Sequence, residues 1–257
     1  MFNDLKLSVQ YWRIWLLGSI YQVTLSYRRT WLGTLWLSVT VIVVVLLKSF
    51  LFAGVFSQSA ERLVPSLAMG MAFWRLFSGL IGGGTQSFIK ARPLLINQGY
   101  PLSVATMSNF SSAIFVFLHS FIPMVIISLF YTVPSLDRIA LLVLGLLLVL
   151  VSLKGVSFVF AMIGTKYRDF ANLISSAMAV LFLVTPVIWL PEMAKGPRKI
   201  FLDFNPLYHY LEVLRDPIIN QPVEWINWIV VLGFTFVAWF LAVILFYKDK
   251  RKVLTFL

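Results

Sequence analysis

Side chains that could perform chemistry are few in this sequence. The two histidines, His119 and His209, belong to no H-E-x-x-H or similar metal-binding spacing, and His119 is readily explained as a hydrogen-bonded residue between helices. The carboxylates Asp203, Glu212 and Asp216 are close enough in sequence to pair for acid–base chemistry, although a solvated loop explains them more simply. The absence of cysteine excludes disulfides, thiolate metal ligands and cysteine nucleophiles. We therefore predict neither a catalytic residue nor a metal site in this chain.

ATP hydrolysis by this chain is also not expected, because the sequence contains no G-x-x-x-x-G-K-[ST] phosphate-binding loop. The glycine run from Gly82 to Gly84 has no lysine after it and lies within an apolar stretch. Gly79 and Gly83 instead have the small-xxx-small spacing that lets two membrane helices approach closely. The chain is accordingly predicted to need no cofactor of its own.

Three cations, Lys48, Arg75 and Lys154, lie inside long apolar stretches that contain no acid to pair with them. A charge in the hydrocarbon layer costs at least about 2.5 to 3.5 kcal/mol, so each cation needs water, a partner or a route to the interface. Two interpretations stay open. These residues line a hydrated conduit for an anionic cargo, or they snorkel and bind backbone carbonyls, which suits Lys48.

The elements that must position these residues are membrane helices. The chain has 257 residues, of which 60% are hydrophobic and 12% charged, which is too apolar for one water-soluble core. A helix needs about 20 mostly apolar residues to cross a hydrocarbon layer of roughly 30 Å. The apolar runs lack the alternation of a membrane β-barrel strand. The sequence therefore predicts a single all-α polytopic membrane domain over residues 1–257.

Six spanning segments are predicted, after an amphipathic interface helix within residues 1–32 that runs from Asn3 to Arg29. The spans are Gly33 to Phe56, Val64 to Phe88, Met107 to Tyr131, Ile139 to Gly164, Asn172 to Leu190, and Trp225 to Tyr247.

The distribution of charge predicts the orientation. Residues 1–32, 89–106, 165–171 and 248–257 hold twelve Lys and Arg against three acids, whereas the remaining loops hold six cations and seven acids. By the positive-inside rule both termini are cytoplasmic. The net charge of +11 thus reflects topology and not nucleic-acid binding.

Residues 191–224, between the last two spans, are too long for a turn and too apolar for an aqueous loop. Four prolines, Pro197, Pro206, Pro217 and Pro222, divide this outer segment into short pieces. One interpretation is a re-entrant pair of half-helices, which membrane depth permits only when they are buried in protein or line a watery cavity. The other is a helical cap on the outer surface.

Motifs along the whole chain resemble the ABC-2 family of exporter permeases. The YRRxxLGxLW stretch from Tyr27 to Trp36 follows the interface helix, and the turn from Lys166 to Asp169 precedes the fifth span. Further matches lie in the outer part of the chain, at Thr185 to Val187, Asn205 to Leu207, and Arg215. Without a large extracytoplasmic domain, the chain is most similar to the polysaccharide branch, which exports O-antigen, capsule or teichoic acid.

This resemblance implies a homodimer in the bacterial inner membrane, bound to two copies of a separate ATPase subunit that carries ATP and Mg²⁺. It implies a lipid-linked polysaccharide as substrate. It also suggests that part of the loop after the second span forms a short cytoplasmic helix that docks in a groove of the ATPase, with Leu94, Leu95 and Ile96 as apolar anchors. A plain interhelical loop is the alternative. This coupling segment consists of Arg92, Pro93, Leu94, Leu95, Ile96, Asn97, Gln98, Gly99 and Tyr100.

Three further groups of residues receive roles in this scheme. Adjacent arginines at the membrane boundary suit a pyrophosphate-linked lipid head group. Aromatic rings near them suit stacking on sugars in a conduit lined by the first and fifth spans, although lipid-facing rings are equally common. The residues are Tyr27, Arg28 and Arg29 for the head group, Trp31, Trp36, Arg75 and Lys154 for the conduit, and Asn205, Pro206, Tyr208 and Arg215 for the outer gate.

Two rival functions remain. A stand-alone flippase or proton-coupled carrier would be expected to place acids inside its spans for proton relay, and this sequence has none there. A membrane-embedded glycosyl- or acyltransferase would need clustered carboxylates or histidines at one interface, and only residues 191–224 offer candidates.

Overall fold

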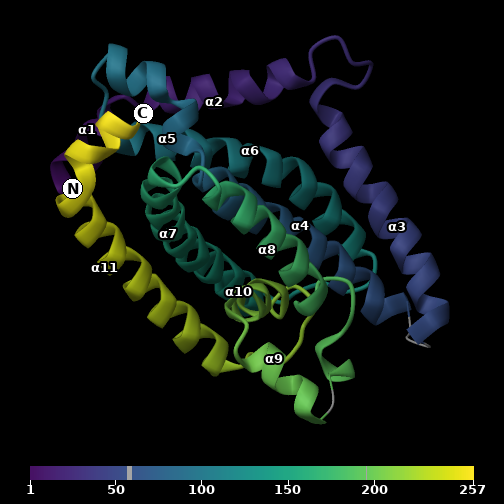
Figure 1. Ribbon diagram of the computed structural model, residues 1–257. Helices are drawn as coiled ribbons and strands as arrows, with labels where there is room; N and C mark the ends of the chain where they lie inside the picture. Colours follow the sequence, from purple (N-terminus) through teal and green to yellow (C-terminus); the bar gives the residue numbers. More distant parts are fainter. Residues whose placement is uncertain (57–59, 195) are drawn as a thin grey trace.

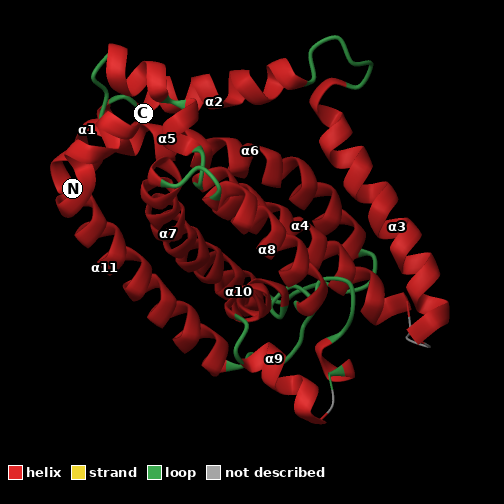
Figure 2. Cartoon of the chain, viewed as in Figure 1, coloured by secondary structure: helices red, strands yellow, loops and turns green. Residues whose placement is uncertain are grey.

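The computed structural model describes residues 1–56, 60–194 and 196–257, and within these ranges every regular element is a helix (Figures 1 and 2). Lys195, counted among the outer cations, lies outside the described residues. Among the described residues, five helices are long and apolar enough to cross a membrane, which confirms the all-α membrane architecture. They are α3 (Trp36–Phe56), α4 (Ala60–Gly84), α6 (Leu102–Leu129), α7 (Leu136–Lys166) and α11 (Trp225–Phe256).

The predicted fifth span is shorter than expected. Helix α8 (Phe170–Val184) has 15 residues, which at about 1.5 Å per residue gives a length of ~22 Å. A hydrocarbon layer of roughly 30 Å is thicker than this. The helix ends because Thr185, with an extended backbone, precedes Pro186, whose ring disfavours the helical conformation in the residue before it. The chain continues from Thr185 to Leu190 without a helix, so a sixth continuous span is not observed.

The interface helix predicted from Asn3 to Arg29 is two helices, α1 (Phe2–Gln10) and α2 (Trp12–Ser26). The break lies at Tyr11, where the indole nitrogen of Trp15 donates to the carbonyl of Ser8 at 2.8 Å. That carbonyl would otherwise accept the helical bond from the amide of Trp12. Helix α2 crosses the end of the bundle near both termini (Figure 1). Ser8 and Ser19 are buried in the chain, whereas the apolar side chain of Trp12 is exposed, which an amphipathic helix lying against the bundle would not predict.

The core of the bundle surrounds α4, which packs against α3, α6, α7 and α8. Phe73 and Phe77 of α4 are fully buried there. Close approach of α7 to the end of α4 depends on glycine, because a Cβ added to Gly164 would lie 2.1 Å from the carbonyl oxygen of Thr85. Nothing lies within 4 Å of a Cβ added to Gly233 of α11.

Replacing Gly164 with alanine is expected to destabilise the chain by about 1 to 3 kcal/mol, because the new methyl group forces α7 away from a backbone atom. The effect is measured as a lower melting temperature in detergent. Gly233→Ala provides the matched control, and it should leave the melting temperature unchanged or raise it slightly, since alanine favours a helix over glycine. Equal melting temperatures for the two variants would contradict this account of the α4–α7 contact.

Candidate functional site

The outer segment contains two helices, α9 (Ile200–Asp203) and α10 (Pro206–Arg215). Helix α10 begins where the side chain of Asn205 accepts a hydrogen bond from the amide of Leu207 at 3.0 Å, a standard N-cap, and Pro206 occupies the first turn. The side-chain nitrogen of Asn205, Nδ2, donates to the hydroxyl of Thr185 at 2.8 Å. Nearly every residue of α10 is buried, in contact with α4, α7 and α11. Helix α10 is therefore packed into the protein at one end of the bundle.

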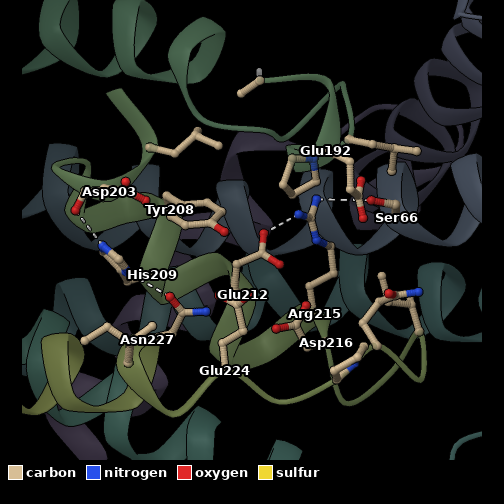
Figure 3. Close-up of a pocket in the computed structure, with 18 of the residues that line it drawn as sticks. Ser66, Glu192, Asp203, Tyr208, His209, Glu212, Arg215, Asp216, Glu224 and Asn227 are labelled. Carbon is tan, nitrogen blue, oxygen red and sulfur yellow. Dashed lines mark hydrogen bonds and ion pairs between the residues drawn. The ribbon is translucent and has the colours of Figure 1, made fainter. Parts of the chain in front are cut away.

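Arg215 is the centre of a buried network at this end (Figure 3). Its side chain is 1% exposed and forms an ion pair with Glu212, one turn earlier on α10. The guanidinium also donates to the carbonyl of Pro186 at 2.6 Å and to the hydroxyl of Ser66 at 3.1 Å. One side chain thus joins α10, the stretch that follows α8, and α4.

A cavity of about 680 Å³ lies beside this network, and Tyr208, Glu212 and Asp216 are among its lining residues. Burial, and then the negative charge of Glu212, raise the pKa of Asp216 to about 10. The side chain of Glu212 is paired with that of Arg215. His209 bridges Asn227 at 2.7 Å and the carbonyl of residue 203 at 3.0 Å. The imidazole of His209 thus links α10 to α11, and the carboxylate of Glu212 is used in an ion pair within α10.

The four predicted gate residues are brought together. Asn205 and Pro206 start α10, Tyr208 lines the cavity, and Arg215 ends the helix. The sequence did not reveal the partners of Arg215, because Ser66 and Pro186 are far from it along the chain.

At the opposite end of the bundle, the coupling segment follows α5 (Ser87–Lys90). It forms a π-helical turn, η2 (Pro93–Asn97), closed by a bond from the amide of Tyr100 to the carbonyl of Leu94 at 3.2 Å. Gly99 has a positive φ of 67°, which glycine adopts without strain. This turn replaces the regular short helix that the sequence suggested.

The three apolar residues of the coupling segment that were predicted as anchors differ in their exposure to solvent. Leu95 is 3% exposed and belongs to a core cluster with Phe88 and Met1, so it is not available as an anchor for a partner. Leu94 is half-buried against the same cluster, and Ile96 is 44% exposed. The exposed ridge of the segment consists of Arg92, Pro93, Ile96, Asn97, Gln98 and Gly99.

The predicted head-group residues lie in the turn between α2 and α3, at the same end of the bundle (Figure 1). Tyr27 and Arg28 line an open cavity of about 640 Å³, and both arginines are exposed. Arg29 has a φ of 69°, in the left-handed region that L-residues rarely adopt. Two adjacent cations are thus held at a sharp turn where the chain enters its first long apolar helix.

The predicted conduit residues do not share one surface. Trp31 is 93% exposed and Trp36 is 40% exposed, at the start of α3. Arg75 of α4 is half-buried and donates to the carbonyl of Leu37 at 3.1 Å.

Lys154 of α7 is buried inside the chain at 6% exposure. Its ammonium group donates to the hydroxyl of Thr106 at 3.0 Å and lies 5.5 Å from the centre of the Phe110 ring. Lys154 therefore faces α6 inside the chain. A hydroxyl and an aromatic ring face contact this buried cation in place of water. Its position within an apolar run of the sequence could not reveal these contacts.

Comparison with known proteins agrees with this architecture. Residues 16–219 match the family described as ABC-2 type transporter. The chain is 25% identical over 214 residues to an O-antigen export system permease protein RfbA of Klebsiella pneumoniae, covering 81% of each chain. A protein of the same name from Myxococcus xanthus is 25% identical over 183 residues, or 70% of each chain. Because the family match covers most of the sequence and five helices in the described ranges are suited to span a membrane, this chain belongs to the ABC-2 type transporter family, as a membrane permease.

Proposed function

We propose that this permease exports a lipid-linked polysaccharide of the O-antigen type across the bacterial inner membrane, driven by a separate ATPase subunit. The observation that carries the proposal is the similarity, over about four-fifths of the chain, to permeases named for O-antigen export. The exposed ridge of the coupling segment supports it, because a permease that lacks a nucleotide-binding loop must receive its energy through a docking surface. ATP and Mg²⁺ would bind to the partner subunit.

The orientation in this proposal places both termini and the coupling segment in the cytoplasm. Twelve cations against three acids in the predicted inner pieces support it. Both termini also lie at the end of the bundle that carries α2 and α5 (Figure 1). Helix α8 and the stretch after it complete a sixth crossing, which needs protein contacts around its non-helical part.

The proposed conduit lies between two copies of the chain, along α3 and α8. Both helices carry exposed apolar side chains, such as Leu47 of α3 and Leu183 of α8. They already contact each other through Lys48, whose ammonium lies 4.9 Å from the centre of the Phe182 ring. Trp31 and Trp36 would stand at the cytoplasmic entrance of this path, with Arg75 behind them.

The outer segment is proposed as a re-entrant gate. The burial of α10 against α4, α7 and α11 favours this role over a surface cap, because a cap would leave one face of α10 in solvent. Movement of α10 would have to break or carry with it the bonds of Arg215, so the gate and the end of α8 should move together.

Deleting this chain from its host tests the function. We expect lipid-linked polymer to accumulate inside the cell and surface glycan to disappear, and a Walker-motif ATPase to copurify with the tagged chain. Normal surface glycan in the deletion strain would refute the export function. Transport by the purified chain alone in liposomes would refute the requirement for an ATPase.

Replacing both Arg28 and Arg29 with glutamine is expected to weaken binding of a pyrophosphate-linked lipid by about 2 kcal/mol, since each cation near an anionic head group contributes about 1 kcal/mol. The backbone strain at position 29 is unchanged, because glutamine also has a Cβ. The measurement is lipid binding to the purified permease, together with glycan export. Arg13→Gln, on the exposed part of α2, is the control. Unchanged binding and export in the double variant would show that this turn does not hold the head group.

A further inference from the structure

Helix α1 is joined to the region of the coupling segment by a buried carboxylate. Asp4 is 5% exposed, and its Oδ2 accepts hydrogen bonds from the amide of Ser103 at 2.9 Å and from the Ser103 hydroxyl. Ser103 is the second residue of α6, three positions after the end of the coupling segment. The bond thus fixes the point where the coupling segment leads into a long apolar helix.

In this contact, a side chain of α1 caps the N-terminal end of α6. The first amides of a helix have no partner within it and carry partial positive charge, so they favour an anion nearby. The residue that precedes α6 is Pro101, whose side chain has no hydrogen-bonding group. Asp4 provides the missing acceptor from a position 99 residues earlier in the sequence.

Two further contacts hold the same region. The rings of Tyr11 and Tyr100 meet edge to face with their centres 4.8 Å apart, which ties the end of α1 to the last residue of the coupling segment. Met1 and Leu95 belong to one core cluster. The N-terminal region from Met1 to Tyr11 therefore contacts the end of the coupling segment through Tyr11 and the start of α6 through Asp4.

The C-terminal end of α11 closes this assembly. Lys250 places its ammonium 3.6 Å from Oδ1 of Asp4, and the amino group of Met1 donates to the hydroxyl of Tyr247 at 3.3 Å. Helix α1 is thus held between the last turns of one long helix and the first turn of another. Such an arrangement leaves α1 little freedom to move independently of α6.

We propose that α1 is a clamp that makes the coupling segment and α6 move as one body, with Asp4 as its positioning residue. The inference rests on the proposed function, because it assigns the clamp to the transmission of ATPase motion. A displaced coupling segment would otherwise bend at Pro101, where the backbone is extended, and leave α6 in place. Asp4 prevents this by holding the first turn of α6 to the same helix that contacts Tyr100.

The test compares Asp4→Asn and Asp4→Leu in the complete permease–ATPase complex. Asparagine keeps an oxygen that can accept from the Ser103 amide, whereas leucine leaves this buried donor without an acceptor. We expect membrane level and ATPase copurification to stay normal in both. Glycan exported per ATP hydrolysed should fall about tenfold for Asp4→Leu and less for Asp4→Asn. Asp137→Asn is the matched control, since Asp137 lies in the first turn of α7 with its side chain 75% exposed, and it should behave as wild type.

A cross-linking experiment tests the clamp independently if the Asp4→Leu variant does not accumulate in the membrane. The sequence has no cysteine, so Tyr11→Cys with Tyr100→Cys introduces a single reactive pair. Export by this double variant is measured before and after a short bis-maleimide links the two positions, and linking should not lower it further, because the linked parts already move together. Loss of export on cross-linking, with ATP hydrolysis preserved, would overturn the clamp, as would wild-type coupling in Asp4→Leu. A failed export function is distinguishable, because then the unmodified complex would also not export.

Discussion

Replacing Arg215 with methionine is expected to remove most folded permease from the membrane and to abolish export. Methionine roughly matches the volume of the arginine stem but leaves Glu212, a buried carboxylate, without its cation. Breaking a buried ion pair by removing one partner typically costs about 3 to 5 kcal/mol. The carbonyl of Pro186 and the hydroxyl of Ser66 lose their donor at the same time. The measurement is the melting temperature in detergent, together with surface glycan.

Two variants make this prediction specific to the buried pair. Adding Glu212→Gln to Arg215→Met should recover part of the loss, because the uncompensated charge is then gone. Arg62→Met removes the ion pair with Glu192, in which both side chains are largely exposed, and should cost no more than about 1 kcal/mol. If Arg215→Met melted and exported like the wild type, Arg215 would not be the link between α10, α4 and the end of α8.

The second large effect is expected at Ile96. Arginine at this position should leave the permease folded in the membrane but prevent the ATPase from copurifying, and export should be lost. Ile96 is the most exposed of the three neighbouring leucine and isoleucine residues in the coupling segment, and apolar anchors at an interface commonly contribute at least about 2 kcal/mol. The measurement is the affinity of the purified ATPase for the permease in nanodiscs or detergent.

The controls for Ile96 use residues of the same kind. Ile200→Arg changes an isoleucine that is 55% exposed at the opposite end of the bundle, and ATPase binding should persist. Leu95→Arg should instead reduce the amount of folded permease, because Leu95 is packed within the chain. Normal ATPase binding by Ile96→Arg would place the docking surface elsewhere.

Local patterns were sufficient to predict several parts of this protein. Five long apolar runs became five helices because each run is by itself long enough to satisfy its backbone in lipid. Pro206, one of the four prolines expected to divide residues 191–224 into short pieces, occupies the first turn of α10, where a proline lacks no hydrogen bond that the helix needs. The predicted fifth span was too long, because the apolar run continues past Thr185 whereas the helix ends before Pro186.

By itself, then, the sequence determined that this chain is a membrane protein and which of its connecting pieces carry most of the cations. It also determined that the chain contains no nucleotide-binding loop. These properties depend on composition and on spacing along the chain. The tertiary structure decided that Arg215 and Lys154 are buried, that Ile96 and not Leu95 faces outward, and that Asp4 caps α6. Each of these depends on contacts between residues distant in sequence, and the burial or pairing of a side chain is fixed only when the helices pack together.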